Sequence, residues 1–192
     1  MWLTTLYEHP IPALQWGTAL GASLVAAFLD LRSRRIPNLL TGPLLVSGWI
    51  SSAWIAGWTG LLDSMAATVL LATPFVLLFA FAGGGAGDAK LMGALGAWLG
   101  VVNGLAALLA VCLCGMVIAV VFAASKGRLG TVIWNLSGTV FGLLRPTAGL
   151  ASVREAGRLA PRPHEGLKMP YGLAILAGTA LAGGGLWLCK RA

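Results

Sequence analysis

The sequence predicts an all-α integral membrane protein with about six transmembrane helices. Of its 192 residues, 58% are hydrophobic and only 10% are charged, and the mean hydropathy is +0.86. This composition is that of a polytopic membrane protein. Apolar runs recur along the chain, which has room for five or six spans of roughly 20 residues each plus loops. We therefore interpret residues 1–192 as a single polytopic domain.

The first predicted span is 13–29, in which Gly17 and Gly21 have the spacing of a close helix-packing motif. Residues 1–12 contain no Lys or Arg, so we expect no secretory signal peptide. Three arginines follow the span, and the positive-inside rule places that end in the cytoplasm. These residues are Arg32, Arg34 and Arg35. The N-terminus is therefore expected outside.

Two further spans, 39–58 and 64–82, form the next predicted hairpin. Pro37 ends the first helix, and Asn38 is a candidate N-cap for the second. The outer turn between the two spans carries Asp63. The outer half of 39–58 contains tryptophans suited to the membrane interface, namely Trp49, Trp54 and Trp58. The hairpin returns the chain to the cytoplasmic face.

The apolar run from 88 to 124 is too long for one span. We divide it near residues 100–104, a glycine-flanked segment, which gives a short span 88–99 and a full span 104–124. Gly93 and Gly96 lie in the short span and Gly100 directly follows it, and these glycines suit tight packing against neighbouring helices.

Residues 125–168 are predicted to form a cytoplasmic segment, followed by the last span, 170–189. The apolar piece 131–144 within it is too short to cross, so we expect it at the interface. Both termini then lie outside, and eleven of the 13 Lys and Arg residues lie on the cytoplasmic side. The net charge of +7 thus indicates topology and contact with lipid headgroups, anionic ones included, rather than nucleic-acid binding.

A candidate site lies at residues 83–90, Gly-Gly-Gly-Ala-Gly-Asp-Ala-Lys, which interrupt the apolar sequence. Asp88 at a membrane boundary is a functional hypothesis by default. Asp30 ends the first span on the same face, and two carboxylates at equal depth can share a proton and activate a water. In the alternative interpretation, the two aspartates are separate, neutralised by arginines and by Lys90 respectively.

Three motifs in this order resemble those of the type IV prepilin peptidase family. Residues 85–88 match the GxGD motif of intramembrane-type aspartic proteases, and the flank 89–98 resembles the prepilin peptidases more closely. Asp30 with 34–38 looks like the first aspartate motif, and 168–172 look like the C-terminal signature. The site residues indicated in this way are Asp30, Arg35, Pro37, Asn38, Gly85, Gly87, Asp88, Lys90, Pro170, Tyr171 and Gly172.

The resemblance implies a hydrolase of the bacterial inner (cytoplasmic) membrane. Its expected activity is cleavage of the short basic leader from type IV prepilins or pseudopilins at the cytoplasmic membrane face, with Asp30 and Asp88 as the catalytic pair and no cofactor. Larger family members carry an N-terminal domain with paired CxxC motifs and also N-methylate the product. Only residues 1–12 precede the first span here and no CxxC occurs. The chain therefore looks like the short peptidases of tight-adherence (Flp-type) pilus systems, and methyltransferase activity is not expected.

Two alternative functions were compared with leader cleavage. A presenilin-like or signal-peptide-peptidase-like protease would carry Pro-Ala-Leu where residues 169–172 read Met-Pro-Tyr-Gly. A small proton-coupled transporter would place its carboxylates near the bilayer midplane, often in repeated halves, and no repeat is found.

No Cys or His occurs at ligand spacing, so no metal site is expected. Nothing in the sequence predicts a particular oligomeric state.

Overall fold

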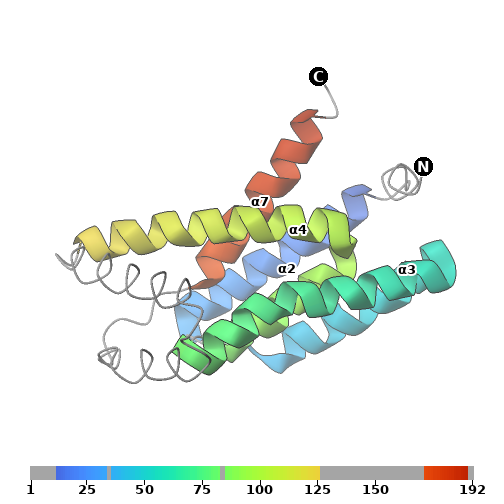
Figure 1. The fold of residues 1–192 in the computed structure, drawn as a ribbon, viewed down its shortest axis with the longest axis horizontal. Coiled ribbons are helices and arrows are strands. Elements are labelled where there is room, and N and C mark those ends of the chain that lie inside the picture. Colours follow the sequence, from blue (N-terminus) through green and yellow to red (C-terminus); the bar gives the residue numbers. More distant parts are fainter. Residues whose placement is uncertain (1–11, 34–35, 83–84, 126–170, 190–192) are drawn as a thin grey trace, which may run out of the picture.

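The computed structural model describes residues 12–33, 36–82, 85–125 and 171–189, and all regular structure within these ranges is helical. Figure 1 shows the four helices, which are α2 (Pro12–Ser33), α3 (Asn38–Ala82), α4 (Ala86–Ser125) and α7 (Tyr171–Cys189). Three of them contain stretches long and apolar enough to cross a membrane, Ala13–Ser33, Asn38–Phe79 and Ala86–Val121. A shorter apolar helix runs from Tyr171 to Leu186. The all-α fold class is confirmed for these residues, and the helices fit a membrane protein.

Several predicted features lie outside the described residues. They are Arg35, Pro170, the interfacial piece 131–144 and all of segment 125–168 except Ser125 itself. The expectations for these residues stay predictions.

Helices α3 and α4 each reverse direction at one glycine (Figure 1). Gly57 has φ = 61° and Gly100 has φ = 70°, a left-handed conformation that costs glycine little. Each helix therefore has two arms, 38–56 and 58–82 in α3, and 86–99 and 101–125 in α4. The predicted position of the outer turn, between residues 58 and 64, is wrong. Because one glycine reverses the chain, the residues from 58 onward are already helical.

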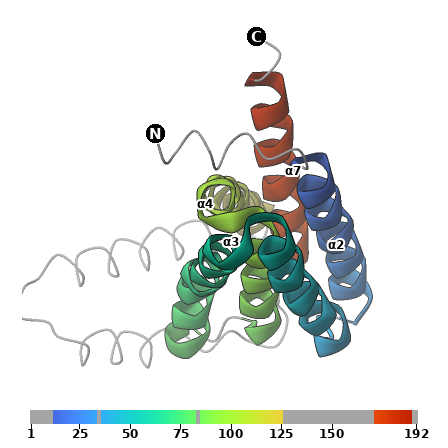
Figure 2. The same cartoon turned by 90° about the vertical axis from the view of Figure 1, so that its right-hand side faces the viewer.

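The first arm of α4 forms the centre of the bundle. Figure 2 shows it between the two splayed arms of α3, and all of residues 91–97 are buried. A methyl group at Gly96 would lie 2.7 Å from the carbonyl oxygen of Ala67, so this helix approaches the second arm of α3 backbone to backbone. Small residues permit such packing in membranes. The largest buried side chains include Leu71, Leu91, Met92, Leu95, Val111 and Ile175.

The break at Gly100 separates two backbone groups that would bond in a continuous helix, the N–H of Val101 and the C=O of Ala97. Each finds a side-chain partner on α3 instead. Val101 donates to Oδ2 of Asp63 at 3.3 Å. The hydroxyl of Ser64, which is buried, donates to the Ala97 oxygen at 2.6 Å, and Ser52 donates to the same oxygen at 3.3 Å. A break in a helix at membrane depth requires such replacements, because lipid offers none.

Two sequence-based expectations about packing need correction. Gly17 and Gly21 have nothing within 4 Å of an added Cβ, so this spacing does not mark a close helix contact among the described residues. Trp54 and Trp58 are 89% and 72% exposed beside the Gly57 reversal, as interfacial anchors would be. Trp49 instead donates its ring N–H to the hydroxyl of Thr68 at 3.1 Å and thereby links the two arms of α3.

Candidate active site

Three helix ends meet at the candidate site. Asp30 lies one turn before the end of α2, Asp88 lies in the first turn of α4, and Tyr171 and Gly172 begin α7. In Figure 1 the end of α2 and the start of α7 lie together at one end of the bundle. Residues from three distant parts of the sequence are thus brought to one place.

A hydrogen bond fixes Asp30 against α7. The backbone N–H of Gly172 donates to Oδ2 of Asp30 at 3.0 Å. A Cβ at position 172 would lie 3.0 Å from the Cβ of Asp30 and 3.1 Å from the Cα of Ala27, so only glycine fits without a shift. The first N–H groups of a helix have no partner within it, and they form the positive end of its dipole. The start of α7 therefore orients the Asp30 carboxyl group.

Gly85 and Gly87 stand before Asp88 at positions where a side chain would be crowded, and neither has an unusual backbone angle. Among the glycines of the described ranges, only those at the two reversals have positive φ. A Cβ at Gly85 would lie 2.7 Å from Oδ2 of Asp88, and a Cβ at Gly87 would lie 3.1 Å from the Cβ of Ile36. The N–H of Asp88 donates to the Gly85 oxygen at 3.2 Å, which starts α4. Asp88 is half-buried and lies within electrostatic range of Asp30.

Tyr171 closes the site from the side of α7. Its ring packs edge-on against Phe75 of α3, with ring centroids 6.3 Å apart and an interplanar angle of 86°. A Cβ at Gly115 of α4 would lie 3.4 Å from the same ring. The phenol also lies within electrostatic range of Asp88. Tyr171 thus joins α7 to both longer helices next to the two carboxyl groups.

Lys90 and Asn38 form a contact of their own beside this site. The ammonium of Lys90 donates to Oδ1 of Asn38 at 2.9 Å. Helix α3 is started by the Pro37 oxygen, which accepts from Leu40 N–H at 3.1 Å. The expected N-cap role of Asn38 is therefore wrong, since its side chain links α3 to α4. Lys90 likewise points to Asn38, whereas the alternative interpretation had it neutralise Asp88.

The structure brings together four of the residues indicated by the sequence and adds neighbours that the motifs did not include. Gly172 is hydrogen-bonded to Asp30, and Asp88 lies within electrostatic range of both Asp30 and Tyr171. Lys90 and Asn38 are hydrogen-bonded to each other at the start of α4. The added neighbours are Ala27, Ile36 and Phe75. Ala27 had a usable signal, because it is a small residue three positions before Asp30 and hence on the same helix face. Within the described ranges no cluster of three or more His, Cys, Asp or Glu could hold a metal ion.

Comparison with known proteins gives one family. The model of the type IV leader peptidase family matches residues 18–120, which is more than half of the 192 residues. The matched range includes Asp30, Asp88 and the whole of α3. The comparison with curated proteins gave no match, and neither did the comparison with solved structures.

Proposed function

The chain belongs to the type IV leader peptidase family, and we propose that it is an aspartic endopeptidase whose catalytic pair is Asp30 and Asp88. Its substrates are type IV prepilins or pseudopilins, from which it removes the basic leader at the cytoplasmic face of the bacterial inner membrane. The observation that carries the proposal is that these two carboxyl groups, from the end of α2 and the start of α4, lie within electrostatic range of each other in a chain of this peptidase family.

The proposed chemistry needs one proton shared by the two carboxyl groups and one water between them. The ionised carboxylate takes a proton from the water as the water oxygen bonds to the carbonyl carbon of the scissile peptide. The protonated partner gives its proton to the carbonyl oxygen. The resulting diol then collapses, the C–N bond breaks, and a proton passes to the leaving nitrogen. Two carboxyl groups close together favour this arrangement, because like charges at short range cannot both ionise freely.

The surrounding residues support these roles by holding the carboxyl groups in place. The Gly172 N–H occupies one oxygen of Asp30 and leaves the other for water. The space at Gly85 keeps Oδ2 of Asp88 from being displaced. Preorganisation of this kind is what an active site requires, since a misplacement of about 1 Å can cost about 100-fold in rate.

The proposal includes the six-span topology with both termini outside. The two glycine reversals divide α3 and α4 into arms, which together with α2 and α7 correspond to six segments. The arginines after α2 favour the cytoplasmic side for the end that carries Asp30. The family match favours leader cleavage over a presenilin-like protease or a transporter.

The experiment is co-expression with a candidate prepilin from the same source, followed by N-terminal sequencing of the product. We expect Asp30→Asn and Asp88→Asn each to abolish cleavage while the protein still inserts. Asp63→Asn is the matched control, because it makes the same change away from the pair and keeps an oxygen for the Val101 N–H. Substantial processing by either variant, at wild-type expression, would refute the assignment of the pair.

A further inference from the structure

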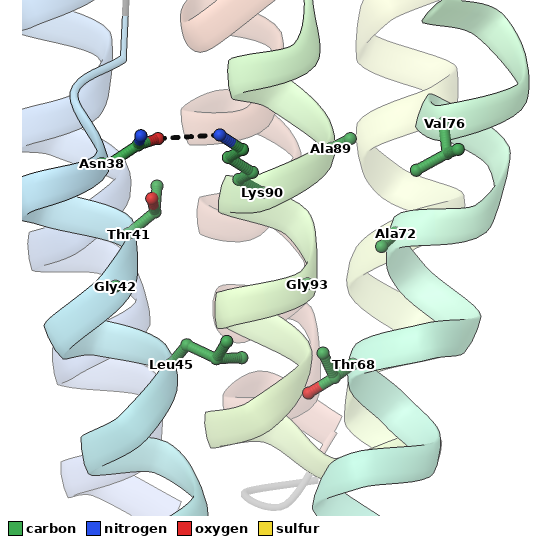
Figure 3. A pocket seen from close by; sticks show the side chains of 10 residues that line it. All are labelled: Asn38, Thr41, Gly42, Leu45, Thr68, Ala72, Val76, Ala89, Lys90 and Gly93. Carbon is green, nitrogen blue, oxygen red and sulfur yellow. Dashed lines mark hydrogen bonds between the residues drawn. The ribbon is translucent and has the colours of Figure 1, made fainter. Parts of the chain in front are cut away.

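Helix α4 starts against the segment that joins α2 to α3. A Cβ at Gly87 would lie 3.1 Å from the Cβ of Ile36 and 3.5 Å from its backbone nitrogen. Three residues further along α4, the ammonium of Lys90 donates to Oδ1 of Asn38 at 2.9 Å, the dashed line in Figure 3. Positions three apart share one face of a helix. One face of the first turn of α4 therefore contacts residues 36–38 at both of these positions.

Side chains leave the space beside this hydrogen bond open. A groove of about 390 Å³ lies between the two arms of α3 and the first arm of α4, and Lys90 and Asn38 are among its lining residues. Figure 3 shows the hydrogen bond crossing from one helix to the other, with Gly42 of α3 and Gly93 of α4 further along the same gap. Near Asp88, a hydrogen bond thus joins two helices that are not packed tightly against each other.

The other end of this arm of α4 is attached to α3 by hydrogen bonds to backbone oxygens. The ring N–H of Trp98 donates to the Leu44 oxygen at 2.9 Å, and the Ser64 hydroxyl donates to the Ala97 oxygen at 2.6 Å. Both contacts lie within three residues of the reversal at Gly100. They hold the end of the arm that is distant from Asp88. The position of the first turn therefore depends on the contacts of residues 87 and 90.

These contacts connect the two segments that carry the carboxyl groups. Asp30 precedes Asn38 by eight positions, and Asp88 precedes Lys90 by two. Successive residues of an α-helix are rotated by about 100°, so Asp88 and Lys90 point roughly 200° apart. Asn38 thus holds the face of α4 opposite to the one that carries Asp88. A rotation of this turn that released Lys90 would also turn Asp88 relative to Asp30.

We propose that Lys90 is a positioning residue, which acts through Asn38 to fix the rotation of the first turn of α4 and thereby the position of Asp88 relative to Asp30. This inference rests on the proposed function. The ammonium acts here as a hydrogen-bond donor to a neutral amide, and not as a charge partner of Asp88. Pro37 makes residues 36–38 a stiff support for this contact, because its ring fixes the backbone φ angle.

The test removes the acceptor and leaves the charge in place. Asn38→Leu keeps a side chain of similar size and the Lys90 cation, whereas Lys90→Met removes the donor. For a prepilin that the wild-type protein cleaves, we expect each variant to lower kcat roughly tenfold with KM unchanged, because a misplacement of about 1 Å can cost about 100-fold in rate. The double variant should be no slower than the slower single variant, since both residues form one contact. Lys90→Arg keeps a donor and should restore the rate.

Arg32→Met is the matched control for the loss of a positive charge. Arg32 is exposed and lies two residues after Asp30, and its removal should leave kcat unchanged. All rates are expressed per folded molecule, so a loss of stability alone does not count as a loss of activity. A loss in Lys90→Met with wild-type kcat in Asn38→Leu would assign the effect to charge and overturn the inference. Losses that multiply in the double variant, or that affect KM alone, would overturn it as well.

The outcomes separate this inference from the function on which it rests. If Asp88→Asn abolishes cleavage while Lys90→Met and Asn38→Leu both cleave with wild-type kcat, the positioning role is wrong and the proposed peptidase stands. If Asp88→Asn still cleaves at the wild-type rate, the catalytic assignment itself fails, and the inference fails with it.

Discussion

The backbone N–H of Gly172 reaches Oδ2 of Asp30 at 3.0 Å, although the two residues are 142 positions apart. This hydrogen bond makes the start of α7 part of the candidate active site. It also explains why glycine stands at this position, because any side chain would separate α7 from α2. Gly172, the last residue of the predicted C-terminal signature, thus orients a carboxyl group that lies at the other end of the sequence.

Gly172→Ala is expected to lower the rate of leader cleavage roughly 10- to 100-fold, because the added methyl group must displace Asp30 or α7, and a misplacement of about 1 Å can cost about 100-fold in rate. Single-turnover cleavage in detergent would measure it. Gly184→Ala in the same helix has nothing within 4 Å and should leave the rate unchanged. Equal rates for both variants would show that the close contact at 172 does not matter.

Gly85→Ala is expected to reduce activity more than stability. Its methyl group would lie 2.7 Å from Oδ2 of Asp88, so the carboxyl group must rotate away, whereas the exposed backbone at position 85 adapts readily. Cleavage rate and thermal unfolding would be compared with those of Gly17→Ala, an open position on α2. A variant that unfolds early but cleaves normally per folded molecule would contradict the interpretation.

Asp63→Ala is expected to destabilise the protein by about 1–3 kcal/mol, because it leaves the Val101 N–H without a partner at the Gly100 break. Asp63→Asn keeps an acceptor oxygen and should cost less. Reversible unfolding in mixed detergent micelles would give both values. If alanine and asparagine have the same effect, the hydrogen bond to Val101 contributes nothing measurable.

Tyr171→Ala is expected to lower both stability and activity, by about 3 kcal/mol in the free energy of unfolding, since the ring fills space between Phe75 and Gly115. Tyr171→Phe keeps that packing and should retain the stability. Unfolding of the two variants measures the packing contribution. Loss of cleavage in a fully stable Tyr171→Phe protein would instead assign a direct role to the hydroxyl.

The helical class could be predicted from the sequence, and candidate site residues could be selected from it, because both depend on local patterns. Hydropathy marks the apolar segments, and a carboxylate after a glycine run is conspicuous in such a chain. Contacts between segments that are distant in the sequence could not be predicted from local patterns. Asp63 looked like a turn residue, and its role became visible only when α3 met the break in α4. Asn38 is of a residue type that commonly caps a helix, but its Oδ1 atom accepts a hydrogen bond from the Lys90 ammonium.

Gly57 illustrates the same limit. The segment 57–60 contains glycine at both ends, and hydropathy does not distinguish between them. The structure reverses at Gly57, whereas Gly60 is helical and crowded, with an added Cβ 2.6 Å from that of Ala56. Which glycine adopts positive φ depends on how the two arms of α3 pair, and this is information that a single sequence does not carry locally.

The first arm of α4, residues 86–99, has a consequence for how the protein responds to its lipid environment. At 1.5 Å per residue it rises only about 20 Å, while the hydrocarbon core of a typical bilayer is about 30 Å thick. In the proposed six-span topology an arm of that length does not reach both surfaces, so acyl chain length would set how deep Asp88 lies and how easily water arrives there. Bilayer thickness would then act on the proposed carboxyl pair through hydrophobic mismatch, without any bound effector.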